Sequence, residues 1–509
     1  MPTLGSPLLS IPSCALLASI ALALAPSAAA QCTYSWPASA FGTGCNDGVT
    51  AATVLPNGDA VVGGRFSDAG GVAVSRIARW DGAAWNTLGT GMNQDVHVLL
   101  ALPDGQLLAG GAFTTAGGIT CNGVARWDGS TWNAVGSGVD PIVVFGSSVQ
   151  ALAILGNGEL VAGGSFTSIG GLTVNNIARW NGTTWSALGT GINGPVRGLT
   201  VAANGDMFAT GSFTLASGVA AANIARWNGT AWSAVGTGLS VFGGSAITTM
   251  PNGDIVVGGS FLTAGGAAAN RIARWNGTAW SALGSGVNAL VTSLLAMPNG
   301  DVVAGGLFTT AGGAPANRIA RWNGSVWNAF GSGTDNSVQE LALLNTGDVL
   351  AAGEFLNANA TPAGRVARLV SSCAPSAVSL GGGCTGIGGP NVLTATQLPL
   401  LGGTFRAVGT GMPPLGLVVS LLGFSSGSVP LNAIFAEALP GCLLTCAPDS
   451  IGTLTPSAGV ATTVISVPNT PALAGAVAFH QYLPFALDLS LVITEITATN
   501  GLQVTLGTF

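Results

Sequence analysis

The chain contains no lysine, and all 14 of its basic residues are arginine. Charged residues make up only 7% of its 509 residues, and the formal net charge is −6. Nucleic-acid binding depends on a concentrated positive surface that neutralises phosphate groups. This composition therefore argues against nucleic acid as a partner.

Histidine and tyrosine are almost as scarce as lysine. The two histidines are His97 and His480, and the two tyrosines are Tyr34 and Tyr482. We expect each histidine to be a loop or surface residue rather than a catalyst. The acidic residues lack calcium-loop spacing, and the glycine-rich stretches are not attached to a strand-to-helix crossover that could hold phosphate. We therefore predict no catalytic residue, no cofactor and no metal site.

Long apolar runs are missing as well, except near the start of the chain. Residues 16 to 25 form a short apolar core, and Ala28-Ala29-Ala30 is a small-residue cleavage site. A core of this length is typical of an export signal and is too short to span a bilayer. The sequence predicts a signal peptide over residues 1–30, a secreted or cell-surface protein, and no membrane span.

A repeat dominates what the sequence does contain. The core motif Arg-Trp-Asn/Asp-Gly-x-x-Trp occurs six times at intervals of 47 to 53 residues. Self-similarity at this period indicates a propeller or a solenoid. Each unit contains four short strand-like segments and no 3.6-residue apolar period, which predicts an all-β fold. The first tryptophans of the six motifs are Trp80, Trp127, Trp180, Trp227, Trp275 and Trp322.

Each motif also predicts a tight hairpin. Asn-Gly is the strongest short hairpin signal, because a type I′ turn needs positive φ at both positions. With Asn323-Gly324 as the turn pair, Trp322 would lie opposite Ser325, and Trp327 opposite Ala320. The two tryptophans would then be diagonal neighbours on one face of the sheet.

The arginine of each motif points to the other face, and stacked sheets bury both faces, so it needs a partner. The second strand begins with an acidic residue that antiparallel pairing places near this arginine. We predict an internal ring of structural ion pairs; the alternative is an arginine ring that binds an anionic ligand. The second repeat offers Gln106 to Arg126 instead of an acid. The predicted pairs are Arg79 with Asp59, Arg179 with Glu159, Arg226 with Asp206, Arg274 with Asp254, Arg321 with Asp301, and Arg368 with Asp348.

The ends of the repeat region predict a closed ring. Gly-x-Phe ends the second strand seven times, but the tryptophan hairpin occurs only six times. The segment from Trp36 to Gly44 resembles the missing last strand, so the N-terminal strand is expected to complete a seven-bladed β-propeller over residues 31–373. A disulfide between Cys32 and Cys373 would clasp the ring where the two ends meet.

The composition changes after residue 373. Tryptophan disappears, and short strand-like runs alternate with Pro/Gly turns over residues 374–509. This pattern predicts a small β-sandwich module. For Cys442 and Cys446 we favour a disulfide over a metal site, because no histidine or second cysteine pair stands at ligand spacing.

The loops between the second and third strands, together with the connections between repeats, should share one rim of the propeller. Loops on a rigid scaffold carry function, so this rim is the expected binding face. We predict a non-enzymatic binding or scaffold protein with a protein or glycan ligand. The alternative is a carbohydrate-active hydrolase that uses rim carboxylates. The candidate rim residues are Asp68, Asp95, Asp140, Asp335 and Glu354.

The double glycine at the end of the second strand, as in Gly63-Gly64, followed by an aromatic residue and a tryptophan, resembles kelch repeats and their galactose-oxidase-like relatives. The resemblance implies a β-propeller whose last blade is shared between the chain ends. It does not carry over copper-radical chemistry, which needs two histidines and two tyrosines at the metal.

The motif Ile-Ala-Arg-Trp-Asn-Gly is also similar to repeats of fungal cortical bud-site markers. The C-terminal part resembles a module at the ends of planctomycete secreted proteins, which implies attachment or sorting.

Overall fold

The computed structural model describes residues 34–38, 40–140, 147–240, 242–371, 376–380, 383–399, 403–439, 442–467, 476–488 and 493–506. The predicted signal peptide, and both Cys32 and Cys373 of the predicted clasp, lie outside these residues. The regular secondary structure of the described chain consists of β-strands, apart from one short 3-10 helix, η1 (Leu431–Ala433). Within the described part, no helix could cross a membrane.

The repeats form seven four-stranded antiparallel sheets in the described part of the chain, numbered one to seven along the sequence. Sheets one to four contain β2 (Val49–Val54), β3 (Ala60–Gly64), β6 (Ile77–Trp80) and β7 (Trp85–Asn86); β8 (Val96–Ala101), β9 (Leu107–Gly111), β12 (Val124–Trp127) and β13 (Trp132–Ala134); β14 (Ser148–Ile154), β15 (Leu160–Ser165), β18 (Ile177–Trp180) and β19 (Trp185–Ala187); β20 (Val196–Val201), β21 (Met207–Gly211), β24 (Ile224–Trp227) and β25 (Trp232–Ala234). Sheets five to seven contain β26 (Gly244–Thr249), β27 (Ile255–Gly259), β30 (Ile272–Trp275) and β31 (Trp280–Ala282); β32 (Val291–Ala296), β33 (Val302–Gly306), β36 (Ile319–Trp322) and β37 (Trp327–Ala329); β38 (Val338–Leu343), β39 (Val349–Gly353), β42 (Val366–Ser371) and β1 (Tyr34–Ser35).

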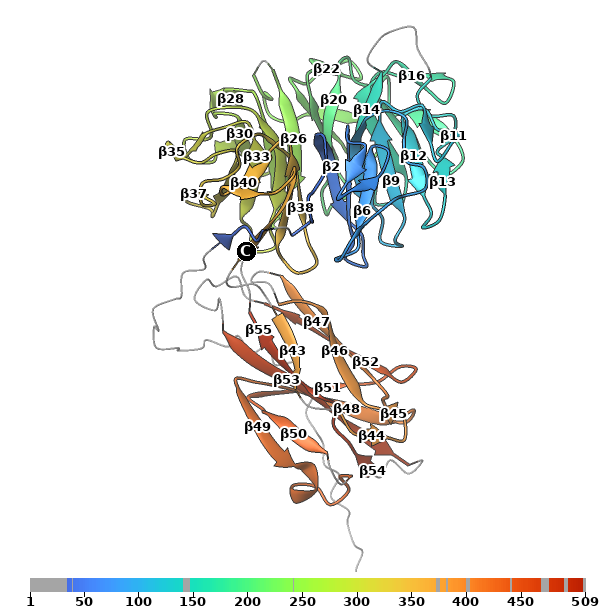
Figure 1. Ribbon diagram of the computed structural model, residues 1–509, viewed down its shortest axis with the longest axis vertical. Helices are drawn as coiled ribbons and strands as arrows, with labels where there is room; N and C mark the ends of the chain where they lie inside the picture. Colours follow the sequence, from blue (N-terminus) through green and yellow to red (C-terminus); the bar gives the residue numbers. More distant parts are fainter. Residues whose placement is uncertain are drawn as a thin grey trace, which may run out of the picture.

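The first strands of the seven sheets form the inner wall of a ring. Each inner strand contacts the next, and β38 of sheet seven contacts β2 of sheet one. Figure 1 shows the sheets side by side around this centre. The chain therefore closes on itself and leaves no open edge at either end of the array.

Small hairpins between the second and third strands of each sheet crown one end of the ring, which we call the loop rim. It lies at the top of Figure 1, and the opposite end, with the turns between first and second strands, is the turn rim. The hairpins are β4 (Asp68–Ala69) with β5 (Val72–Ala73), β10 (Thr115–Ala116) with β11 (Ile119–Thr120), β16 (Ser168–Ile169) with β17 (Leu172–Thr173), β22 (Leu215–Ala216) with β23 (Val219–Ala220), β28 (Thr263–Ala264) with β29 (Ala267–Ala268), β34 (Thr310–Ala311) with β35 (Ala314–Pro315), and β40 (Asn357–Ala358) with β41 (Thr361–Pro362).

The first glycine of the double glycine lets neighbouring sheets approach closely. A Cβ atom at Gly63 would lie 2.6 Å from Cγ1 of Val96 in the next sheet. A Cβ atom at Gly64 would lie 2.2 Å from the carbonyl oxygen of Gly48, which precedes β2 in the same sheet. Real Cβ atoms do not tolerate such contacts, because interiors are close-packed. The first glycine therefore sets the spacing between adjacent sheets, and the second lets β3 pass close to the backbone before β2.

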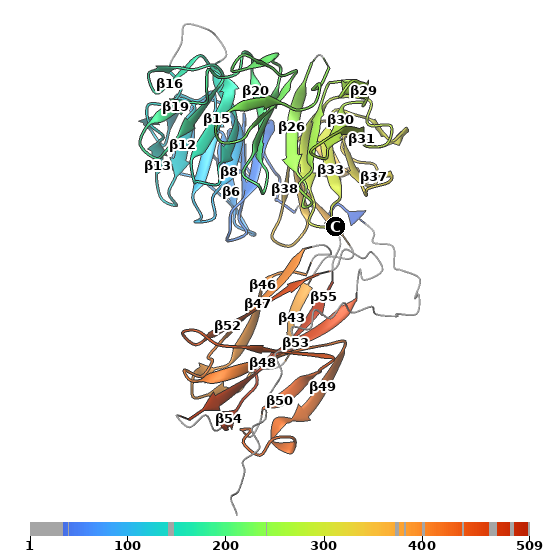
Figure 2. The ribbon, with the colours of Figure 1, turned by 180° about the vertical axis from the view of Figure 1, so that it is seen from behind.

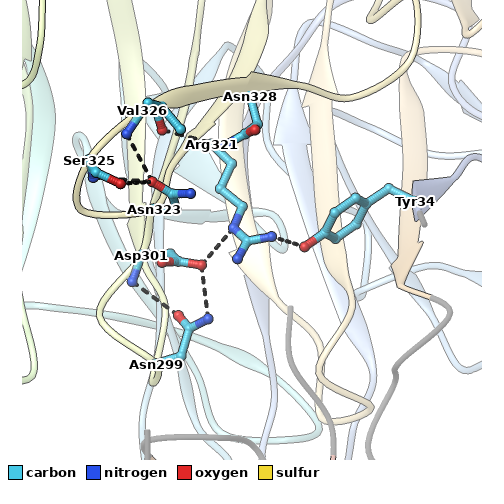
Figure 3. A network of polar contacts seen from close by, with 8 residues as sticks. All are labelled: Tyr34, Asn299, Asp301, Arg321, Asn323, Ser325, Val326 and Asn328. Carbon is cyan, nitrogen blue, oxygen red and sulfur yellow. Dashed lines mark hydrogen bonds and ion pairs between the residues drawn. The ribbon is translucent and has the colours of Figure 1, made fainter. Parts of the chain in front are cut away.

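The tryptophan hairpin differs from the predicted register. Trp322 pairs directly with Trp327, and Arg321 pairs with Asn328, so the loop has four residues rather than two. The side-chain oxygen of Asn323 accepts hydrogen bonds from the backbone N–H of Ser325 at 3.1 Å and of Val326 at 2.9 Å. This asparagine turn replaces the type I′ turn, because the side chain itself caps the loop. Figure 3 shows the turn.

The N-terminal strand completes sheet seven. In β1, Tyr34 pairs with Ser371 and Ser35 with Val370. Trp36 then donates its indole N–H to the carbonyl oxygen of Phe330 in sheet six, at 3.2 Å. The same bond joins each fourth-strand tryptophan to the preceding sheet: Trp85 to Phe41, Trp132 to Leu88, Trp185 to Val135, Trp232 to Leu188, Trp280 to Val235, and Trp327 to Leu283.

The C-terminal part contains two main sheets and lies beyond the turn rim, as Figures 1 and 2 show. Buried Phe405 and Ala407 of one sheet pack with buried Val418, Tyr482 and Leu502 of the other. One sheet contains β43 (Ser376–Leu380), β55 (Gly501–Thr505), β53 (Val477–Leu487), β48 (Gly416–Gly423), β51 (Ser450–Leu454) and β54 (Ile493–Ile496), and the other β46 (Val392–Gln397), β47 (Thr404–Thr410) and β52 (Val460–Ser466). The hairpins are β44 (Thr385–Gly386) with β45 (Gly389–Pro390) and β49 (Ser425–Pro430) with β50 (Leu443–Ala447).

The expected disulfide between Cys442 and Cys446 is wrong. Cys442 is bonded to Cys384, 58 residues earlier in the chain, and Cys446 is a buried free thiol. The Cys446 side chain lies in the interior beside β53, where its sulfur is 3.3 Å from the carbonyl oxygen of Phe479.

Removal of the indole of Trp36 should destabilise the ring. We expect Trp36→Ala to cost about 3–5 kcal/mol of unfolding free energy, because a buried aromatic side chain and its hydrogen bond are lost. Trp36→Phe keeps most of the apolar contact and should cost about 1–2 kcal/mol. Urea unfolding followed by tryptophan fluorescence measures both, and an unchanged midpoint for Trp36→Ala would contradict ring closure by this residue.

Candidate functional site

The loop rim contains a recurring clasp between the connection that enters each sheet and the hairpin of that sheet. The side chain of Asn93 accepts hydrogen bonds from the backbone N–H groups of Thr114 and Thr115, both at 3.0 Å. We call this arrangement the rim clasp. The equivalent acceptors in the other sheets are Asn46, Asn193, Ser240, Asn288 and Asp335.

One candidate rim residue, Asp335, makes the rim clasp of sheet seven. It accepts hydrogen bonds from the backbone N–H groups of Leu356 at 2.9 Å and Asn357 at 3.1 Å. Asp140 follows the same Gly-x-Gly-x pattern in sheet three, but it accepts its described hydrogen bond from Gly171 in the hairpin turn, at 3.2 Å. Burial acts to raise the pKa of Asp335, but the hydrogen bonds from Asn357 and Leu356 outweigh it and lower the pKa. Both carboxylates hold loops in place, and the shared sequence position was the signal that identifies this role.

The other three candidate rim acids have separate partners. Asp68 accepts a hydrogen bond from the backbone N–H of Gly71 at 3.0 Å, and Asp95 lies 3.6 Å from Arg76. Glu354 pairs with Arg65 across the boundary between sheets seven and one. The described contacts of the five candidate acids share no partner.

The predicted ion pairs of the third-strand arginines lie at the turn rim. Arg226 lies 2.7 Å from Asp206, Arg368 lies 2.7 Å from Asp348, and Arg321 lies 2.5 Å from Asp301. The remaining three pairs are Arg274 with Asp254, Arg79 with Asp59 at 3.5 Å, and Arg179 with Glu159 at 3.3 Å. No ion pair of Arg126 occurs among the described residues.

These pairs differ from the prediction in their surroundings. The acids are mostly buried, but five of the six arginines expose between 35% and 46% of their side chains. Partly exposed pairs of this kind contribute about 0–1 kcal/mol each, because water screens them. The ring of arginines is thus half open to solvent rather than internal.

Arg321 is the exception, with 18% of its side chain exposed. Its guanidinium donates a hydrogen bond to the hydroxyl of Tyr34, and its Cζ atom lies 5.5 Å from the centre of the tyrosine ring. Figure 3 shows Arg321 between Asp301 and this tyrosine. The arginine therefore connects sheet six to the N-terminal strand.

The centre of the ring holds a cavity of about 150 Å³ near the loop rim. It is lined by residues of six inner strands, mainly the second to fourth residue of each. The residue that follows the first aligned inner-strand position has five different identities in the seven sheets: Thr50, His97, Gln150, Arg197, Ser245, Thr292 and Gln339. All of these except Thr50 and Gln339 line the cavity. Because the surrounding repeat is so regular, this variation marks the cavity as a candidate site.

Glu340 is the carboxylate that lines this cavity. It stands where the other inner strands have Ala, Val, Gly or Ser. Ser293 donates a hydrogen bond from its hydroxyl to Glu340 Oε1 at 2.7 Å, and the backbone N–H of Leu341 donates to the same oxygen at 3.0 Å. Burial raises the pKa of Glu340 to about 7, although both hydrogen bonds act in the opposite direction. The carboxyl group therefore changes its charge near neutral pH.

His97 and Arg197 line the same cavity. Burial lowers the pKa of His97, opposed by the charge of Asp95, and its buried Nδ1 atom has no hydrogen-bond partner among the described residues. Arg197 donates from Nη1 to the hydroxyl of Ser212 at 2.8 Å. His97 was predicted to be a loop or surface residue, and it instead lies in the inner strand β8 with a half-buried side chain.

Two protein-family models match the repeat region. The Rax2 C-terminal beta propeller domain matches residues 82–249, and a beta-propeller domain of unknown function, DUF5122, matches residues 251–278 and 298–324. Both describe β-propellers, in agreement with the repeated four-stranded sheets. No curated protein matches the chain. The kelch and planctomycete resemblances remain predictions.

Solved structures show only distant likeness. The extracellular domain of BT4673 from B. thetaiotaomicron has 9% identity and a TM-score of 0.42, over 92% of this chain and 57% of that one. A fungal alcohol oxidase of the AA5 family, in complex with copper, has 10% identity and a TM-score of 0.31, over 88% and 84%. The chain thus spans 57% of the length of the first structure. At these TM-scores neither likeness supports an inference about activity.

Replacement of the rim-clasp acid should affect stability through its acceptor oxygens rather than its charge. We expect Asp335→Ala to cost about 1–2 kcal/mol, because two backbone N–H groups lose their acceptor. Asp335→Asn should stay within about 0.5 kcal/mol of the wild type, because asparagine fills this position in other sheets. Urea unfolding at pH 7 measures both. An equal loss in the two variants would contradict the clasp.

The effect of Asp335→Ala should also depend on pH. Since the pKa of Asp335 is lowered in the folded chain, the loss of unfolding free energy in Asp335→Ala should become smaller as the pH falls through that pKa.

Glu340 should weaken the fold as the pH rises. Its pKa is about 7 in the folded chain and 4.5 in the unfolded chain, so folding binds a proton between these pH values. Stability from this group is complete below about pH 4.5 and is lost as the pH rises through 7. We expect Glu340→Gln to be stabilised relative to wild type at pH 8 by up to about 3 kcal/mol and to match it near pH 4.5. A pH-independent difference in urea unfolding would contradict the raised pKa.

Proposed function

We propose that this protein is an exported, non-enzymatic binding or scaffold protein, with a protein or glycan ligand at the loop rim. Residues 31–373 would form a seven-bladed β-propeller closed by the N-terminal strand. Residues 374–509 would form a β-sandwich module that attaches or spaces the propeller, and residues 1–30 would be removed as a signal peptide. The Cys384–Cys442 disulfide supports export, because disulfides persist in oxidising compartments.

The observation that carries this proposal is that each of the five candidate rim carboxylates already has a partner within the protein. Asp140 and Asp335 hold loops, Asp68 caps its own hairpin, and Asp95 and Glu354 are paired with arginines. Glycoside hydrolysis needs two carboxyl groups that face one bond. Since the five acids share no described partner, we do not propose the hydrolase alternative.

Exposed apolar side chains on the loop rim support a binding role. Ile119, Leu172 and Leu356 are exposed in the hairpin regions of other sheets. We call the group in the hairpin regions of sheets four and five and in the connection between these sheets the rim patch. Exposed apolar groups that are not needed for folding mark interaction sites when they gather on one surface. The rim patch contains Leu215, Val219, Phe242 and Leu262, of which Phe242 is 74% exposed.

The backbone of Phe242 adds a second reason. Its φ is +78°, a value that bulky residues avoid because of the steric cost. Strained residues are retained where the surrounding structure needs them, often at ligand sites. The loop rim also lies on the far side of the propeller from the C-terminal module (Figure 2), so a ligand and an attachment surface would not compete.

A binding experiment with rim variants tests the proposal. Mature protein, residues 31–509, would be presented to a glycan array and to purified cell-surface proteins, and hits measured by biolayer interferometry. We expect Phe242→Ser combined with Leu262→Ser to weaken binding at least about tenfold, because each removes apolar burial worth about 1.5–3 kcal/mol.

Val326→Ser is the matched control, because Val326 is 54% exposed on the turn rim. It should leave binding unchanged. Undiminished binding by the double rim variant would contradict the proposal. So would release of sugar from a polysaccharide that Asp335→Asn abolishes, because this variant removes a catalytic carboxylate and keeps the rim clasp.

A further inference from the structure

We propose that the cavity at the centre of the ring binds the carboxylate group of a small hydroxylated acid, with Arg197 as the cation that pairs with it and Glu340 at the facing wall. This site is independent of the rim patch and goes beyond the proposed function. No feature of the repeat requires either side chain at these positions.

The repeat accounts for nearly all other arginines of the propeller. Seven occupy the third strands, and one of the remainder, Arg65, pairs with Glu354. Four more precede the third strand with positive φ, of which Arg271, Arg318 and Arg365 donate hydrogen bonds to backbone carbonyls of neighbouring connections. The fourth, Arg76, lies beside Asp95. Arg197 is the one arginine of the described propeller outside these sets.

Arg197 has capacity for an anion. Its described partner is the hydroxyl of Ser212, a neutral group, and no carboxylate lies within ion-pair distance among the described residues. A guanidinium has five N–H donors in a planar fork that matches a carboxylate. The side chain is exposed on the cavity that Glu340 also lines.

The rest of the wall suits hydroxyl groups. Thr292, Ser293 and Gln150 line the cavity with hydroxyl and amide groups. Such groups can both donate hydrogen bonds to a ligand hydroxyl and accept them from it. Polar groups that converge on a cavity fix the orientation of small ligands.

The size of the cavity and the charges that line it narrow the class of ligand further. The cavity volume of about 150 Å³ is several times the ~10–15 Å³ that one water molecule needs on the same measure, so there is room for an acid of a few carbon atoms. The titratable groups that line the cavity are His97, Arg197 and Glu340. One guanidinium balances one negative charge, whereas a dianionic phosphate would bring a second charge close to Glu340. These features favour a monocarboxylate over phosphate.

Glu340 makes binding depend on pH. Its pKa of about 7 means that the group is neutral at pH 6, where it can donate an O–H to the ligand, and charged at pH 8, where it repels an anion. Affinity for a carboxylate should therefore fall as the pH rises through 7. His97 has a lowered pKa and stays neutral over this range.

Titration calorimetry and ligand-observed NMR with glycolate, its neutral amide glycolamide, and inorganic phosphate test the site in the full mature chain. We expect glycolate to bind at pH 6 at least tenfold more tightly than either other probe and to bind at least threefold more weakly at pH 8. Arg197→Gln should reduce glycolate affinity at least tenfold, and Arg197→Lys should reduce it less. Glu340→Gln should keep binding at pH 6 and remove the fall at pH 8.

Arg126→Gln is the matched control, because it removes the same charge from a third-strand arginine without a described ion pair. Circular dichroism and thermal unfolding establish that each variant is folded. Absence of glycolate binding, equal binding of glycolamide, tighter binding of phosphate, or full affinity in folded Arg197→Gln would each overturn the proposal. The rim-patch double variant should bind glycolate normally, so failure of one site is distinguishable from failure of the other.

Discussion

One hydrogen bond, repeated around the ring, connects each sheet to its neighbour. The indole N–H of a fourth-strand tryptophan reaches the backbone carbonyl of the preceding sheet, and Trp36 makes the bond that joins sheet seven to sheet six. A buried indole N–H needs such an acceptor, because an unpaired donor costs about 1–3 kcal/mol. The bond thus sets the orientation of each sheet as well as its stability, and the regular ring follows from its repetition.

Much of the propeller was predictable from the sequence because its determinants repeat. The Gly-Gly pair, the Trp motif and the acid before the second strand each recur at a constant offset, and each has a physical reason at that offset. The hairpin register was not predictable from Asn323-Gly324 alone. The asparagine side chain competes with the backbone for the loop N–H groups, and the structure resolves this competition in favour of a four-residue loop. The Cys384–Cys442 pairing also depends on tertiary placement, which local spacing does not encode.

The candidate sites were less predictable from the sequence than the fold was. Asp140 and Asp335 stood out as acids on a rim, yet both fill a position that is Asn or Ser elsewhere. Glu340 and Arg197 did not stand out, because each belongs to a short apolar strand that looks like its counterparts. Their signal is the difference between aligned strands rather than a motif. In a repeat protein, positions that agree between repeats explain the fold, and positions that disagree are where a ligand would be recognised.

Closure by β1 has a consequence for how the chain acquires its structure. Tyr34 and Ser371 are among the most distant residues in the propeller sequence, yet they are strand partners. During synthesis the free side of β42 has no partner until both ends of the propeller come together. Pairings between such distant segments form slowly, because loop-closure entropy must be overcome first. Maturation of this protein therefore depends on an encounter between the first and last strands of the propeller. Before that encounter, the unpaired backbone edge of β42 would be open to pairing with a strand of another molecule.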